Sequence, residues 1–158
     1  MEKVESFKLD HNKVKAPFVR KCCVLEGKMG DKVSKFDLRF LQPNKEAFGT
    51  AAMHGLEHLL ATYLREELDD VIDLSPMGCR TGFYLVLAGD YESKDIVDLM
   101  KEMFDFMRNF EGEVPGACAK DCGNYLDMNL NMAKYLCNKF YTEVLEDITD
   151  EHLVYPQS

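Results

Sequence analysis

The pattern of hydrophobic and polar residues near the start of the chain predicts a β-hairpin. Residues 18–26 and 33–41 read as strands, and the turn-forming sequence GKMGD at 27–31 separates them. In the second stretch apolar residues occupy every other position, which predicts one buried face of the strand and places Arg39 on its other face.

Helical spacing of apolar residues dominates most of the remaining chain. It predicts helices over 50–68, over 93–110 and over about 124–147. Between the first two helices, short apolar runs at 71–74 and 83–88 predict two further strands. The inner stripe of the last helix is expected to comprise Leu126, Leu130, Ala133, Leu136 and Phe140.

Strands paired as hairpins together with several helices predict an α+β fold. In such a fold, helices pack against an antiparallel sheet and bury its apolar face. A chain of 158 residues is long enough for a real hydrophobic core, and no linker or repeat divides it. We therefore expect a single domain over residues 1–158.

The charge and apolar composition narrow the class of protein. A net charge of −9 argues against nucleic-acid binding, because nucleic-acid binders usually present basic patches. Residues 1–10 carry charges where a signal peptide needs an apolar run, and no stretch approaches the roughly 18–20 apolar residues of a membrane span. We expect a cytoplasmic protein without nucleic-acid or membrane partners, whose six cysteines are thiols, metal ligands or nucleophiles rather than disulfides.

The helix predicted over 50–68 carries three ionisable residues among its leucines: His54, Glu57 and His58. Burying such groups without partners is costly. The two histidines are one helical turn apart, so both imidazoles can reach one ion. Glu57 lies beside that face, where it can contact a bound water or substrate without being a ligand. The pattern predicts a metal site.

Two histidines leave at least one protein ligand to find, since a catalytic metal usually has three. The candidates are His11, His152 and a cysteine. Cys122 is favourably placed, next to Gly123 and just before the last helix, although a small buried thiol would fit the same position. The residue types alone leave the third ligand open.

A second group of reactive residues lies in the connection between the strands predicted at 71–74 and 83–88. Cys79 follows Gly78 and precedes Arg80 there. A nearby positive charge lowers the pKa of a thiol and favours the reactive thiolate. Cys79 is therefore a candidate catalytic residue, with an inert loop cysteine as the alternative.

Taken together, these motifs resemble the S-ribosylhomocysteine lyases of the LuxS family. The similarity runs in order over about residues 4–134 and includes VESFKLDHNKVKAPFVR, KFDLRFLQPNK, HGLEH, SPMGCRTGFY and DCG. The resemblance implies a cytoplasmic homodimer with active sites at its interface. It also implies one divalent metal per subunit, Fe2+ first, with Zn2+ or Co2+ also possible.

The resemblance assigns roles to nine residues of this chain. The metal ligands would be His54, His58 and Cys122, and the acid–base pair Glu57 and Cys79. The substrate pocket would be lined by Ser6, His11, Arg39 and Asp73. The family splits S-ribosylhomocysteine into homocysteine and 4,5-dihydroxy-2,3-pentanedione, the precursor of autoinducer-2.

The residue types suit that reaction. The carbonyl of the sugar must migrate along the chain by repeated proton removal and return until the C–S bond can be eliminated. Cys79 and Glu57 can shuttle these protons, and a metal can stabilise the enediolates. Arg39 and Asp73 are suited to the carboxylate and ammonium of the substrate. Alternatively, Arg39 favours the Cys79 thiolate or is a merely exposed strand residue.

Two positions depart from the family pattern. Gly55 stands where the family usually has threonine, and Met128 where it tends to have histidine. These departures support one alternative, a metal-binding or interaction module that has lost catalysis. The other alternative is a metallopeptidase-like hydrolase, because the H-x-x-E-H order also occurs in a family of proteases.

Overall fold

The sheet has four antiparallel strands in the order β1-β2-β4-β3. It is seen in a computed structural model, of which residues 4–155 are described. The strands are β1 (Phe18–Glu26), β2 (Lys32–Arg39), β3 (Val71–Pro76) and β4 (Gly82–Ala88). The predicted hairpin is confirmed, because β1 pairs antiparallel with β2.

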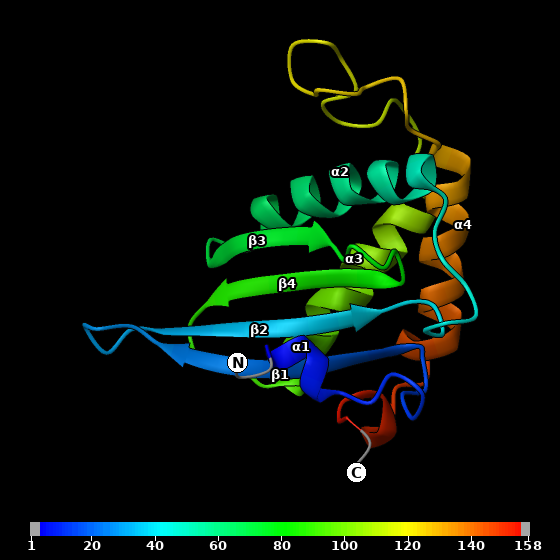
Figure 1. The fold of residues 1–158 in the computed structure, drawn as a ribbon. Coiled ribbons are helices and arrows are strands. Elements are labelled where there is room, and N and C mark those ends of the chain that lie inside the picture. Colours follow the sequence, from blue (N-terminus) through cyan, green and yellow to red (C-terminus); the bar gives the residue numbers. More distant parts are fainter. Residues whose placement is uncertain (1–3, 156–158) are drawn as a thin grey trace.

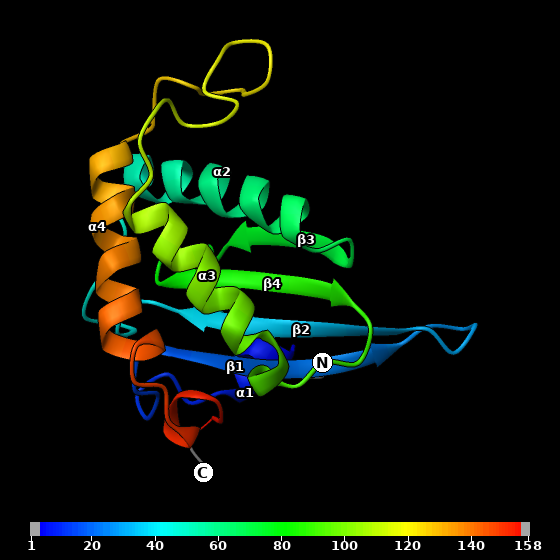
Figure 2. The same cartoon turned by 180° about the vertical axis from the view of Figure 1, so that it is seen from behind.

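Three long helices cover one face of this sheet, so the predicted α+β fold is confirmed (Figures 1 and 2). They are α2 (Thr50–Glu67), α3 (Val97–Arg108) and α4 (Leu130–Phe140). The short helix α1 (Glu5–Lys8) lies on the opposite side of the sheet (Figure 1). Three single turns complete the described chain: η1 (Ser93–Ile96), η2 (Tyr141–Leu145) and η3 (Asp150–His152). No helix in residues 4–155 is long and apolar enough to cross a membrane.

The core lies between the sheet and the three helices. Alternate residues of β2 and β4 point into it, as the strand pattern predicted, and leucines of α2 meet them there: Phe36, Leu38, Phe83, Leu85, Leu87, Leu56, Leu60 and Leu64. Phe40 stacks on Phe140 with ring centroids 4.3 Å apart, and Phe104 lies 4.8 Å from the latter ring. Aromatic contacts of this kind join the end of β2 to α3 and α4.

Gly82 allows β4 to approach β2 closely. It pairs with Arg39, and a Cβ atom added at this glycine would lie 2.3 Å from the carbonyl oxygen of Leu38. A larger residue would push the two strands apart. The glycine therefore holds the preceding turn, including Thr81, against the end of β2.

The last predicted helix begins later than its apolar pattern indicated. Residues 124–129 are irregular, and α4 starts at Leu130, where Asn129 caps it by accepting a hydrogen bond from the Met132 amide at 2.9 Å. The Asn129 amide in turn donates to the carbonyl of Ala51 in α2. Leu126 is 81% exposed, so its assignment to the inner stripe was wrong.

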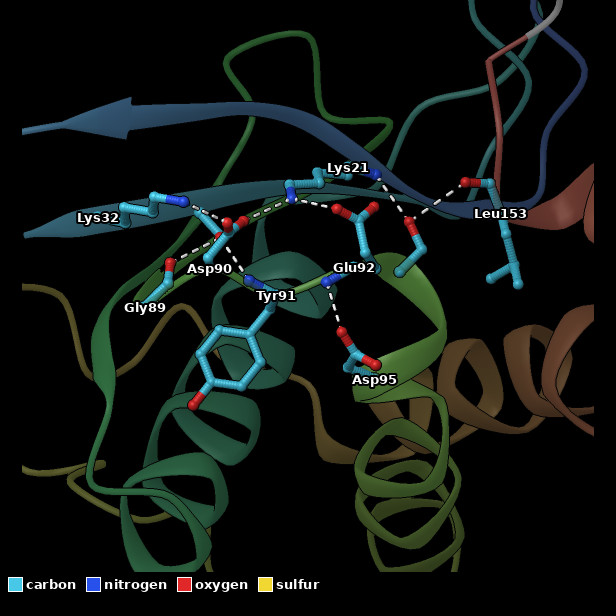
Figure 3. A network of polar contacts seen from close by, with 10 residues as sticks. Lys21, Lys32, Gly89, Asp90, Tyr91, Glu92, Asp95 and Leu153 are labelled. Carbon is cyan, nitrogen blue, oxygen red and sulfur yellow. Dashed lines mark hydrogen bonds and ion pairs between the residues drawn. The ribbon is translucent and has the colours of Figure 1, made fainter.

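Ion pairs tie the connection after β4 to the edge of the sheet (Figure 3). The Lys21 ammonium lies 3.1 Å from Asp90 and 2.7 Å from Glu92, and the Lys32 ammonium lies 2.7 Å from Asp90. Hydrogen bonds from Lys32 and Lys21 hold the pKa of Asp90 below its ordinary value. Since the carboxylates of Asp90 and Glu92 are exposed, each pair contributes little stability by itself.

Candidate active site

Two histidines and one cysteine come together above α2. His54 and His58 lie one turn apart on this helix, and Cys122 reaches them from the long segment between α3 and α4. One ligand atom from each residue lies within 4.8 Å of the others, and the Cys122 sulfur is 3.3 Å from Nε2 of His54. Within residues 4–155 this is the one group of three such side chains close enough to hold a metal ion.

Backbone carbonyls orient both imidazole rings. Nδ1 of His54 is 3.0 Å from the carbonyl oxygen of Asp127, and Nδ1 of His58 is 2.7 Å from that of Pro115. A carbonyl oxygen only accepts hydrogen bonds, so each Nδ1 carries the proton and each Nε2 keeps a free lone pair. Metal-bound histidines are held in this way in proteins. Two imidazoles and a thiolate suit Fe2+ or Zn2+, so the residues fit a metal of this class.

Glycine allows the loop that carries Pro115 to approach His58. Gly116 has a φ of +70°, and a Cβ atom added there would lie 3.2 Å from Nδ1 of this histidine. On the other side of the cluster, the amide of Asn124 donates to the Cys122 sulfur at 3.4 Å. The sequence patterns did not predict these backbone contacts, because an irregular segment has no periodicity that would indicate them.

The two other histidines lie elsewhere. His11 bonds to the carbonyl of Leu9 at 3.0 Å, and Nδ1 of His152 accepts a hydrogen bond from the amide of Thr149 at 3.1 Å. Neither belongs to the group around His54. Of the three candidates for a third ligand, the structure brings Cys122 alone to the two imidazoles.

Cys79 lies at the tip of the turn between β3 and β4. The Arg80 amide closes this turn on the carbonyl of Met77, with the arginine in the left-handed region at a φ of 57°. The Cys79 side chain is exposed and lines a cavity of about 590 Å³. His11 and Arg39, two predicted substrate-binding residues, line the same cavity.

Arg39 is only 2% exposed, so the alternative of a merely exposed strand residue is wrong. Its Nε and Nη2 donate to the Asp37 carboxylate at 3.0 and 2.6 Å, and its Nη1 donates to Thr81 Oγ1 at 3.0 Å. Burial alone would lower the pKa of Arg39, but the hydrogen bonds and charge of Asp37 outweigh it and raise this pKa. The phenol of Tyr155 also donates to Asp37, at 3.1 Å.

The remaining predicted residues are spread over other parts of the molecule. Glu57 is half-buried and lines a cavity of about 280 Å³ together with His58. Asp73 is exposed on β3, and Ser6 is half-buried in α1. Among the cavities found in residues 4–155, Cys79 and Glu57 line different ones. The two proposed proton-transfer groups thus come from different elements, the turn between β3 and β4 and helix α2.

Comparison with known proteins agrees with this geometry. The profile of the S-ribosylhomocysteinase (LuxS) family matches residues 4–151. This chain belongs to the LuxS family. It is 67% identical over 134 residues to the S-ribosylhomocysteine lyase of Clostridioides difficile, an alignment that covers 85% of this chain and 88% of the relative.

Other LuxS relatives align over nearly their whole length. The S-ribosylhomocysteine lyase of Clostridium beijerinckii is 52% identical, with 99% of each chain covered. That of Finegoldia magna is also 52% identical, with 99% of this chain and 100% of the relative covered. The resemblance inferred from the motifs is thus confirmed, and the His-His-Cys group gives this family member a metal-binding site.

Proposed function

We propose that this chain is a metal-dependent S-ribosylhomocysteine lyase. It cleaves S-ribosylhomocysteine to homocysteine and 4,5-dihydroxy-2,3-pentanedione, the precursor of the signal autoinducer-2, in the cytoplasm and as part of methionine metabolism. The proposal is supported most directly by the oriented group of His54, His58 and Cys122, whose ligand atoms lie within 4.8 Å, in a chain of the LuxS family. We further propose that residues 1–158 form a single catalytic domain.

The reaction requires protons to be moved along the sugar before the thioether can leave. Cys79 and Glu57 are the residues we assign to this task, one removing a proton from carbon while the other returns one to the neighbouring position. In the last step a proton is removed from the carbon next to the one that carries sulfur. The C–S bond then breaks and homocysteine leaves. A divalent cation held by His54, His58 and Cys122 supplies Lewis-acid stabilisation of the negative charge that develops on the substrate oxygens. We propose Fe2+, with Zn2+ or Co2+ as alternatives.

The contacts of Arg39 favour one of its two possible roles. All three nitrogens of its guanidinium donate to Asp37 and Thr81, which uses three of its five N–H groups. We therefore propose that Arg39 favours the Cys79 thiolate rather than binding the carboxylate of the substrate. Asp73, which is exposed, remains the candidate for the ammonium, and Ser6 and His11 the candidates for the pocket wall.

A homodimer would bring the separated groups together. Since Cys79 and Glu57 line different cavities of one chain, we propose that each active site combines Cys79 of one subunit with the metal group and Glu57 of its partner. Among the described helices, α1 is the one that lies on the face of the sheet opposite α3 and α4 (Figure 1). In that helix Phe7 is 71% exposed and also lines the Cys79 cavity.

Turnover is the experiment that tests this function. Metal-loaded protein is incubated with S-ribosylhomocysteine, and homocysteine is quantified by chromatography. We expect release by the natural chain and its loss in Cys79→Ala and Glu57→Gln with the metal retained. Cys118→Ala and Glu66→Gln are matched controls, because both residues are exposed and lie outside the two cavities.

Each alternative has its own outcome in this assay. A natural chain that binds metal but releases no homocysteine would identify a module without catalysis. Cleavage of peptides by the metal-loaded protein would point to a hydrolase instead. Normal release by either active-site variant would remove that residue from the mechanism.

A further inference from the structure

A row of hydrogen bonds leads from the buried Arg39 guanidinium to the Cys79 sulfur. The Thr81 hydroxyl is its middle member, 3.0 Å from Nη1 of Arg39 and 3.1 Å from the sulfur. We propose that Thr81 is a positioning residue that orients the Cys79 thiolate. Its hydroxyl, polarised by the Arg39 charge, is a stronger hydrogen-bond donor to the sulfur. The catalytic use of this thiolate rests on the proposed function, whereas the hydrogen-bond row itself does not.

The chemistry of the three groups fixes the direction of the row when Cys79 is a thiolate. A guanidinium nitrogen has protons but no available lone pair, so Nη1 must donate and Thr81 Oγ1 must accept. The single proton of the hydroxyl is not used in that bond. The Cys79 sulfur is the other polar atom that this hydroxyl contacts, and a thiolate only accepts. The row therefore runs from Arg39 through Thr81 to Cys79, with each donor strengthening the next.

The guanidinium end of the row is held firmly. Asp37 accepts two bonds from Arg39 in a fork, and Tyr155 donates to the same carboxylate. Burial, together with the charge of Asp37, raises the pKa of the Tyr155 phenol, so it stays protonated and remains a donor. Asp37 and Arg39 are both almost completely buried. Water therefore screens this end of the row far less than it screens a surface pair.

The backbone also fixes Thr81. Its carbonyl oxygen accepts hydrogen bonds from the amides of Phe40 and Leu41, at 3.0 and 2.9 Å, just beyond β2. The residue is 4% exposed, whereas Cys79, two positions earlier, is open to the cavity. The hydroxyl thus connects a buried charge to an accessible thiol. Because this contact is already ordered in the folded protein, no further conformational entropy is lost in forming it during the reaction.

Other charged groups around Cys79 stay the same when Thr81 is changed. His11, Lys45 and Glu46 line the same cavity. Arg80, the neighbour of Cys79 in the turn, directs its Nη1 to the carbonyl of Phe48 at 3.1 Å. A difference between two Thr81 variants therefore reports on the hydroxyl itself.

The experiment compares Thr81→Val, which removes the hydroxyl at nearly constant shape, with Thr81→Ser, which keeps it. Iodoacetamide alkylation of the Cys79 peptide is followed by mass spectrometry over a range of pH in the natural protein and both variants. We expect Cys79 to be alkylated about tenfold more slowly in the valine variant than in the natural protein near neutral pH, because the thiolate loses the hydrogen bond from the hydroxyl. The serine variant should follow the natural profile. A valine profile that superimposes on the natural one, or a serine variant that behaves like valine, would overturn the proposal.

Two further measurements separate this proposal from other causes. Thermal unfolding checks that the variants are folded, and Thr81→Ala replaces the valine variant if that one does not fold. Turnover of S-ribosylhomocysteine should show a lower kcat in Thr81→Val with a nearly unchanged KM, because the hydroxyl contacts the thiol rather than the substrate. Alkylation needs no substrate. A shifted profile in a protein that releases no homocysteine would therefore contradict the proposed function while leaving the hydrogen-bond row supported.

Discussion

Nδ1 of His58 lies 2.7 Å from the carbonyl oxygen of Pro115, 57 residues further along the chain. This bond connects α2 to the long segment that precedes α4, and its counterpart between His54 and Asp127 does the same at 3.0 Å. Both rings are thus oriented by backbone atoms that no side-chain substitution removes. The fold itself therefore orients both imidazoles of the candidate metal-binding group.

Cys122→Ala should lose the metal. Loss of a group that only supports a metal ligand lowers metal affinity by up to about 100-fold. Removal of one of the three ligands themselves should therefore lower it by more than that. Elemental analysis of anaerobically purified protein measures the bound metal and also identifies it. Cys118→Ala is the matched control, since this exposed thiol lies one turn earlier and bonds to Asp121 instead. Unchanged metal in Cys122→Ala would exclude it as a ligand.

Gly55→Ala should stabilise the protein. This glycine lies inside α2, and a Cβ atom added there would be 3.6 Å from the backbone of Asn129, an ordinary contact distance. Alanine in a helix interior is favoured over glycine by about 1 kcal/mol, so the free energy of unfolding should rise by up to that amount. Urea denaturation of metal-free protein measures it. Gly82→Ala should do the opposite, because its Cβ atom would clash with Leu38; equal effects at the two glycines would refute this account of the local packing.

Asp90→Asn should lower the stability of the folded protein at neutral pH, and this loss should become smaller as the solution is acidified. Hydrogen bonds from Lys32 and Lys21 lower the pKa of Asp90 in the folded state, from 3.8 as its ordinary value. The stabilisation is therefore present above that ordinary value and is lost as the pH falls through the lower folded pKa. Thermal unfolding of both proteins between neutral pH and about pH 3 should show the difference in Tm shrinking. Asp69→Asn, at an exposed position, should show no such trend; a constant difference for Asp90→Asn would contradict the assignment.

Local patterns predicted most of the sheet and the first long helix. The bounds of β1 agree with the predicted 18–26, and α2 ends one residue before the predicted 68. Both elements have apolar residues at regular spacing, and burial of those residues decides where the elements form. The start of α4 was wrong because one capping residue, Asn129, outweighs the apolar character of Leu126.

The contacts that build the candidate site were less predictable. Helical spacing placed His54 and His58 on one face, whereas Cys122 could be chosen only through the resemblance to a family. The alternation in β2 placed Arg39 opposite the core, but nothing local indicated that Asp37 and the distant Tyr155 would enclose it. Such contacts depend on how segments far apart in the chain meet, and a pattern of neighbouring residues does not contain that information.

Mixed dimers test most directly whether the active site is shared between subunits. One subunit carries Cys79→Ala and the other Glu57→Gln, and two different affinity tags allow the heterodimer to be purified. If each site takes Cys79 from one chain and Glu57 from its partner, the heterodimer has one intact site and one site without either group.

The account predicts that this heterodimer releases homocysteine at about half the rate of the natural dimer, while each parent homodimer is inactive. A heterodimer as inactive as its parents would contradict the shared site. It would mean that Cys79 and Glu57 act from the same chain.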